Sequence, residues 1–150
     1  MGEALLYTTG GAGASGGYGD IDDRTLALIA TAGNEGKFES TAGAVVERAA
    51  GANMSVDVAT GWTFIKGELG ILSALQNVAI AANASGNPRI DRVVLRNDFL
   101  NKRIDLDVLT GTPAVSPAAP ALTQNTTTMW EISLAAVAVA SGAVSIVTAD

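Results

Sequence analysis

The chain has no cysteine and no histidine among its 150 residues. The lack of cysteine excludes disulfides, zinc–thiolate sites and thiol nucleophiles, and it leaves the redox compartment open. The lack of histidine removes the commonest general base and metal ligand, so no ordinary Ser–His–Asp triad can form. We therefore expect a protein that is not an enzyme and that holds no metal or cofactor.

Aromatic residues are also scarce, at 5% of the chain, although 48% of the residues are apolar. Much of that apolar fraction is alanine, which buries little surface per residue, so we expect a modestly stable monomer. Part of its apolar surface should then be covered by neighbouring subunits of an assembly. No apolar run approaches the ~18 residues of a membrane helix, and no basic segment precedes an apolar run at the N-terminus. We expect a soluble protein made in the cytoplasm, with no membrane partner.

Positive charge is scarce as well, because nine lysines and arginines face fifteen acids, for a net charge of −6. A surface that follows nucleic-acid phosphates needs clustered lysine and arginine. The basic cluster of this chain is interleaved with aspartates, which indicates a solvated hairpin face of mixed charge and no nucleic-acid partner. Its basic members are Arg89, Arg92, Arg96, Lys102 and Arg103, and its acidic members are Asp91, Asp98, Asp105 and Asp107.

Residues 1–19 are rich in glycine, especially from Gly10 to Gly17. Glycine loses much backbone entropy on ordering, so this segment is predicted to be a flexible arm unless a partner fixes it. Four apolar side chains of the arm are candidate contacts for a partner subunit. They are Leu5, Leu6, Tyr7 and Tyr18.

Residues 20–43 are predicted to form a short helix and a linker, with the helix over residues 20–32. Asp20 or Asp22 can cap this helix, since acidic side chains are favourable at a helix N-terminus. Asp20, Asp22 and Asp23 also suggest a calcium loop, but an EF-hand needs a central glycine and a closing glutamate in register. Those are missing, so capping is the preferred interpretation.

From residue 44 to residue 150 the apolar pattern takes a period of two, which is typical of half-buried strands. Short strands separated by frequent turn signals predict an all-β domain, an antiparallel β-sandwich or small barrel, behind the glycine-rich arm and the one short helix. Gly67–Gly70 is expected to end a strand, and the prolines of Thr112–Pro120 predict an edge or extended connector. The strands are expected at residues 54–58, 62–66, 77–82, 90–96, 103–109, 129–139 and 143–147.

Gly11–Gly16 is a literal G-x-G-x-x-G motif between a short apolar run and the predicted helix. A dinucleotide site needs a βαβ unit around this motif, so that the helix N-terminus meets the pyrophosphate. The chain downstream indicates antiparallel strands instead, and a glycine-rich tract matches such a motif by chance. We therefore predict no bound nucleotide cofactor.

Asp105 and Asp107 form a carboxylate pair on one side of a predicted strand. Glycosidase acids lie apart in a cleft and in different environments, so this pair is better explained as the exposed face of a hairpin. Trp62 and Trp130 are candidates for stacking on a sugar. Each lies inside a strand pattern, however, and packing in the core is the preferred interpretation.

The segment Asn87–Pro120 reads NPRIDRVVLRNDFLNKRIDLDVLTGTPAVSPAAP and joins two alternating strand patterns to a proline-rich connector. Together with the upstream segment Met54–Gly67, MSVDVATGWTFIKG, it resembles a module of tailed-bacteriophage virion proteins. The similarity covers most of Ala44–Val147. The proteins that it resembles are usually minor tail, baseplate or host-adhesion components.

This resemblance implies a non-enzymatic virion structural protein, a minor tail or baseplate component that docks on other virion proteins. It also implies a homo-oligomer, by analogy a trimer, located in the virion after synthesis in the host cytoplasm. A host-surface glycan is a further candidate partner. Besides the arm residues, Arg89, Arg92 and Arg96 are candidate interaction residues.

Two alternatives stay open at this stage. Related proteins often continue into a fibre or receptor-binding part, whereas this chain stops at Asp150, so a capsid decoration protein of the phage head is the first alternative. A carbohydrate-binding module is the second alternative.

Overall fold

The computed structural model of this chain describes residues 36–37 and 41–147. Those residues form ten strands and no helix, and their sheets are antiparallel, which confirms the predicted all-β class and is consistent with a β-sandwich. The predicted arm, helix and most of the linker lie outside the described residues. The strands are β1 (Gly36–Lys37), β2 (Val45–Glu47), β3 (Ser55–Val58), β4 (Gly61–Ile65), β5 (Glu68–Leu72), β6 (Gln76–Ala79), β7 (Arg89–Asp98), β8 (Arg103–Leu109), β9 (Gln124–Asn125) and β10 (Met129–Val139).

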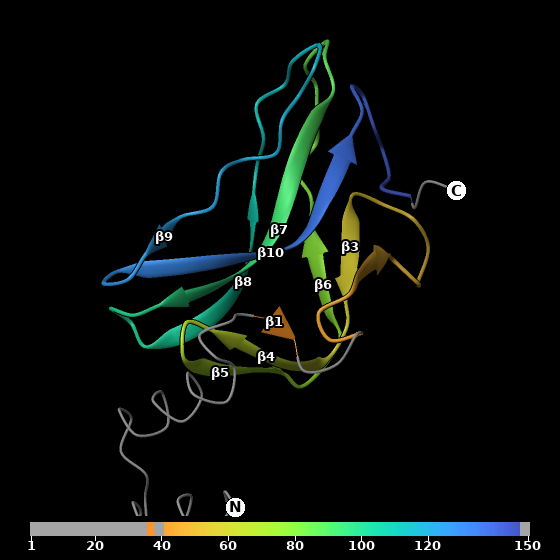
Figure 1. Ribbon diagram of the computed structural model, residues 1–150. Helices are drawn as coiled ribbons and strands as arrows, with labels where there is room; N and C mark the ends of the chain where they lie inside the picture. The colour runs from red at the N-terminus through yellow and green to blue at the C-terminus, as the bar shows by residue number, and fades with distance from the viewer. Residues whose placement is uncertain (1–35, 38–40, 148–150) are drawn as a thin grey trace, which may run out of the picture.

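The ten strands form three sheets, ordered β1-β4-β5, β8-β7-β10-β9 and β2-β3-β6. Figure 1 shows the long strands β7 and β10 at the centre, with the β4–β5 hairpin below them and β3 and β6 alongside. The main core lies between the central sheet β8-β7-β10-β9 and sheet β2-β3-β6. Its buried members are Val56, Val58, Ile80, Val93, Val137, Val139 and Ile146. Within the described ranges, no helix has the length and hydropathy needed to cross a membrane.

The central sheet matches the sequence prediction closely. The predicted hairpin is present as β7 and β8, with Asp98 paired to Arg103 on either side of the turn. The predicted strand 129–139 is β10, and it pairs along the whole length of β7. Leu134 is the extra residue of a β-bulge in β10, because the pairing steps from Ser133–Val94 to Ala135–Val93.

The β4–β5 hairpin differs from the prediction that Gly67–Gly70 ends the strand pattern. Only Lys66 and Gly67 form the turn, and their φ angles of 51° and 84° are those of a two-residue hairpin turn. Gly70 instead lies inside β5, where an added Cβ would come within 2.8 Å of Thr63 Oγ1 and 3.0 Å of Ile104 Cδ1. The glycine is therefore present because β5 packs closely on the central sheet.

The predicted strand at residues 143–147 is not formed. Ile146 is buried, and its amide makes a single backbone hydrogen bond to Asn53 O at 2.8 Å. A turn at Gly142, with φ 70°, redirects the chain after β10, so the apolar run contributes a side chain to the core without pairing as a strand. The predicted strand at residues 77–82 is present in shorter form as β6.

The proline segment Thr112–Pro120 is an extended connector without regular strand pairing, as predicted. In Figure 1 it runs from the upper end of the central sheet down to β9. Gly111 begins the connector, and an added Cβ there would lie 2.0 Å from Ile90 O. Only glycine allows the connector to leave the sheet so close to β7.

Asp57 of β3 is a buried carboxylate that connects β3 to β6 and to the turn after β2, in sheet β2-β3-β6. Its two oxygens accept hydrogen bonds from Asn77 Nδ2 at 2.8 Å and from the amide of Ala49 at 3.0 Å. The hydrogen bond from Asn77, followed by that from Ala49 and the positive charge of Arg48, lowers the pKa of Asp57 below its ordinary value of 3.8.

Asp57→Asn is expected to make unfolding less dependent on pH in acid. A carboxyl with a depressed folded pKa stabilises the fold above its unfolded pKa, and this stabilisation is lost as the pH falls through the folded pKa. The wild-type protein should therefore be more stable than the variant at about pH 6, and the difference should shrink at about pH 3. Urea titrations at both pH values measure the difference. A constant difference would contradict the role given to the carboxylate.

Candidate functional site

The outward face of the β4–β5 hairpin carries large apolar side chains. Trp62, Leu69 and Ile71 are 44%, 52% and 55% exposed. Trp62 pairs with Ile71, and Phe64 pairs with Leu69, so the four residues lie on one face of the hairpin. We call this face the hairpin face. Contiguous exposed apolar side chains of this kind mark interaction sites on soluble proteins.

The preference for placing Trp62 in the core is therefore wrong. The sequence Trp-Thr-Phe-Ile of β4 has apolar residues on both faces of the strand, Trp62 and Phe64 on one and Ile65 on the other. Alternation alone therefore does not tell which face is buried. In the structure Thr63 and Ile65 take the inner positions. Asn97 Nδ2 of the central sheet donates to Ile65 O at 3.0 Å, which holds the end of β4 against the central sheet.

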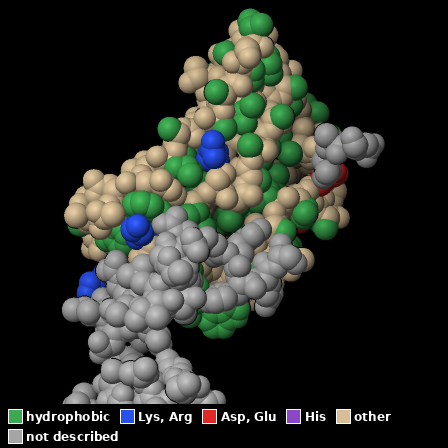
Figure 2. All heavy atoms as spheres, in the orientation of Figure 1, with side chains coloured by type: hydrophobic (Ala, Val, Ile, Leu, Met, Phe, Trp, Pro, Cys, Tyr) green, Lys and Arg blue, Asp and Glu red, His purple; other side chains and the backbone are tan. Residues whose placement is uncertain are grey.

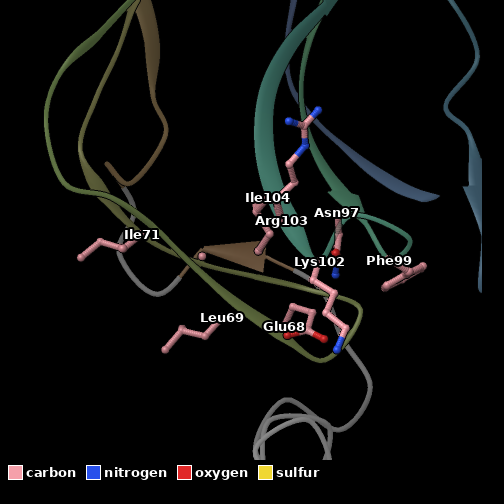
Figure 3. Close-up of a pocket in the computed structure, with 9 residues that line it drawn as sticks. Glu68, Leu69, Ile71, Asn97, Phe99, Lys102, Arg103 and Ile104 are labelled. Carbon is pink, nitrogen blue, oxygen red and sulfur yellow. The ribbon is translucent and has the colours of Figure 1, made fainter. Parts of the chain in front are cut away.

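A groove of about 330 Å³ adjoins the hairpin face, between β5 and β8 (Figure 3). Both strands are edges of their sheets among the described residues. The groove combines apolar side chains of β5 with basic side chains at the start of β8. Its lining consists of Glu68, Leu69, Gly70, Ile71, Asn97, Phe99, Lys102, Arg103 and Ile104. We call it the β5–β8 groove.

The turn between β7 and β8 places the basic side chains of the groove. Asp98 Oδ1 accepts hydrogen bonds from the amides of Leu100 at 3.1 Å and Asn101 at 3.0 Å. Asn101 Nδ2 donates to the second oxygen at 2.7 Å, and this bond is the main reason that the pKa of Asp98 is lowered. Lys102 adopts a φ of 52° to complete the turn. The loop is thus held by its own polar contacts and presents Lys102 at the groove, whereas the guanidinium of Arg103 points away from the groove (Figure 3) and pairs with Asp105 at 2.7 Å.

Arg89, one of the predicted interaction residues, is 5% exposed and is bound inside the molecule. Its Nε and Nη2 donate to Asp91 at 2.8 and 3.0 Å, and its guanidinium also donates to the carbonyls of Ala81 and Ala82. The hydrogen bond to Asp91 raises the pKa of Arg89. Its role in the structure is to join β7 to the loop that precedes it.

Arg96 and Arg92, the other two predicted interaction residues of this strand, are half-buried. Arg96 lies between Asp107 of β8, at 2.6 Å, and Glu131 of β10, at 2.7 Å. Arg92 Nε is buried and has no hydrogen-bond partner among the described residues. The structure thus places none of the three arginines in the β5–β8 groove.

The other residues singled out in the sequence have mixed environments. Asp105 and Asp107 lie on the partly exposed side of β8, as predicted, and Asp105 pairs with exposed Arg103 at 2.7 Å. Trp130 is half-buried beneath Lys66, whose ammonium lies 4.1 Å from the ring centroid. Among residues 36–37 and 41–147, no three acidic side chains are grouped as metal ligands would be. Leu5, Leu6, Tyr7, Tyr18, the glycine motif and Asp20, Asp22 and Asp23 lie outside the described residues.

Sequence reasoning missed the hairpin face and the β5–β8 groove. The available signal was the alternation Leu69-Gly70-Ile71, in which glycine takes the inner position and two large aliphatic residues face outward. Other exposed apolar side chains, such as Leu75, Leu100 and Val115, lie in separate loops, and single ones are normal on a protein surface. Figure 2 shows further apolar side chains over the narrow upper end of the molecule.

Searches against models of known protein families, curated proteins and solved structures returned no match to this chain.

Proposed function

We propose that the protein is a non-enzymatic structural protein of a tailed-bacteriophage virion, a minor tail or baseplate component that docks through the hairpin face. The supporting observation is the exposure of Leu69, Ile71 and Trp62 on one small sheet, beside a groove between two open strand edges. The virion itself is suggested by the resemblance of the Asn87–Pro120 segment.

The chemistry of the surface suits protein docking. Stable protein interfaces have an apolar centre and a polar rim. Leu69 and Ile71 would form the centre here, and Lys102 would lie on the rim, whereas the charge of Arg103 is already paired with Asp105. Basic rim residues favour an acidic surface on the partner, because complementary charge speeds association and discriminates between partners. Three copies of an acidic chain of net charge −6 would need such local complementarity to form the trimer expected from the resemblance.

A lysine pair at the apolar centre is expected to abolish incorporation into particles. Leu69→Lys with Ile71→Lys places two charges where the interface should be dry, while both positions are exposed enough for the fold to tolerate them. Val115→Lys, at an 89% exposed position on the connector, is the matched control and should be incorporated normally. Incorporation is measured by quantifying the protein in purified particles after complementation of a deletion.

The outcomes separate the parts of the proposal. Absence of the wild-type protein from particles would reject the virion function, and normal incorporation of the double variant would reject the hairpin face alone. Electron microscopy of intact particles then distinguishes a tail or baseplate position from the capsid decoration alternative, which would use the same kind of surface.

A carbohydrate-binding module stays a second candidate because of one observation. Trp62 is exposed, and an exposed tryptophan beside other apolar side chains can stack on a sugar ring. A glycan array with the purified protein separates the two candidates. Specific binding that Trp62→Ala removes, with the fold intact, would favour the second one.

A further inference from the structure

A second groove lies between strands β2 and β10 and has a volume of about 270 Å³. It is lined by consecutive residues of both strands, together with three residues from elsewhere. The lining consists of Val45, Val46, Glu47, Val56, Ala135, Ala136, Val137, Ala138, Ile146 and Val147. Successive side chains of a strand point to opposite faces, so a cavity that touches every residue of a run follows the edge of the strand. We call it the β2–β10 groove.

Both strands beside this groove have an open edge. β2 is the end strand of sheet β2-β3-β6. β10 pairs with β7 on one side, and on the other side its pairing within the described part of the chain is limited to Met129 and Trp130 with β9. From Ile132 to Val139 that side of β10 has no strand partner among residues 36–37 and 41–147. An open edge of this length is a template for another strand.

The β2–β10 groove begins on β10 at Ala135, just after the bulge, where the regular pairing of β10 with β7 resumes. The bulge at Leu134 disturbs the backbone, and bulges of this kind discourage pairing at an edge. Beyond it, Ala135–Ala138 returns to regular pairing with β7 and carries small side chains along the groove. The walls are almost entirely aliphatic, so the groove suits an extended segment with apolar residues on both faces.

We propose that the β2–β10 groove binds an added β-strand, and that this strand is the N-terminal stretch Glu3–Thr9 of this chain. The sequence Leu5-Leu6-Tyr7-Thr8-Thr9 places strand-forming residues in succession, with apolar groups in both phases. It contains no proline, so none of the amides that would point towards β10, every second one along the strand, is missing. The proposal goes beyond the proposed function and stands with or without a virion.

The tether between this stretch and the fold is long enough. Residues 10–35 separate it from β1; glycine is concentrated in residues 10–19, and the helix is predicted at residues 20–32. A helix of that length is about 20 Å long and the other residues span about 18–22 Å on average as a flexible chain, whereas a domain of this size has a radius of gyration of about 13 Å. The stretch can therefore reach the groove of its own chain, and in an assembly the groove of a neighbouring copy.

Hydrogen exchange of the full-length protein tests the proposal. Among Ala135–Val139, the amides that point away from β7 should exchange at least about tenfold faster in Leu6→Pro than in the wild type, because proline cannot donate to a ladder and disrupts the added strand. Ala14→Pro, with the same substitution in the glycine tract, should exchange like the wild type. Adding a peptide of residues 2–9 to Leu6→Pro should restore protection, and the same peptide with proline at position 6 should not.

Either of two results would overturn the proposal. One is that the outward amides of Ala135–Val139 exchange equally in the wild type and in Leu6→Pro. The other is that both peptides protect them equally, since contact through side chains alone does not require amide donors. Val46→Lys adds a check from the opposite wall of the groove. Introduced into Leu6→Pro, it should reduce the protection that the peptide restores at least about tenfold, whereas Val115→Lys in the same background should leave that protection unchanged.

Discussion

Asp91→Ala should lower the free energy of unfolding by about 3–5 kcal/mol. Asp91 is fully buried at 0% exposure, and its Oδ1 accepts hydrogen bonds from Arg89 Nε and from the amide of Gly111, both at 2.8 Å. Without the carboxylate, the guanidinium of Arg89 would remain inside the molecule with no counter-charge. Domains of this size are stable by about 5–15 kcal/mol, so the loss is a large share of the total.

Urea unfolding followed by tryptophan fluorescence measures this loss, with Asp105→Ala as the matched control. Asp105 also pairs with an arginine at 2.7 Å, but the partner Arg103 is exposed, and such pairs contribute about 0–1 kcal/mol. The double variant Arg89→Met with Asp91→Leu should recover much of the stability, because it leaves no buried charge unpaired. Equal losses for Asp91→Ala and Asp105→Ala would contradict the importance given to burial.

The central hairpin was predictable because its sequence pattern and its environment agree. Residues 103–109 alternate between aliphatic and charged side chains, and β8 has one partly exposed side, so the period of two carries the information. The long strand β10 was predictable for a similar reason, since Met129–Val139 contains no proline or glycine. In the central sheet, the local sequence pattern is therefore enough to predict where these strands form.

Burial of the charged residues was not predictable from the same pattern. Arg89 and Asp91 are two residues apart on one strand, as are Arg103 and Asp105, yet the first pair is buried and the second is exposed. The difference comes from Gly111, twenty residues beyond Asp91, and from the loop at Ala81 and Ala82, which both contact the first pair and lie outside its strand. Alternating charges in a sequence thus do not distinguish a solvated face from a buried ion pair.

The β5–β8 groove was not predictable from the sequence either, because it also depends on contacts between distant segments. It exists only because β5 packs over Ile104, which brings residues 68–71 beside the turn at residues 97–103. Neither segment carries a motif of its own, and the hairpin face depends on which phase of β4 is buried. That phase depends on contacts with the central sheet from residues more than thirty positions away, such as the packing of Gly70 on Ile104 and the hydrogen bond from Asn97 to Ile65 O.

Glu131 gives the second large effect, and the sequence did not single it out. It is 1% exposed, and its Oε1 accepts hydrogen bonds from Arg96 Nε at 2.9 Å and Nη2 at 2.7 Å. Its Oε2 accepts a hydrogen bond from the amide of Thr123 at 2.7 Å. This carboxylate therefore joins β10 both to β7 and to the end of the proline connector.

Glu131→Ala should cost about 3 kcal/mol, the lower end of the range for breaking a buried pair, because Asp107 continues to neutralise Arg96. Asp107→Ala removes the other partner of the same arginine, but Asp107 is 43% exposed, so its loss should cost less than about 1 kcal/mol. Double-mutant cycles with Arg96→Ala, measured by urea unfolding, isolate the two couplings. The coupling of Arg96 to Glu131 should exceed its coupling to Asp107. If the order is reversed, the closer contact of 2.6 Å to Asp107 outweighs the burial of Glu131, and the connector is held mainly by other contacts.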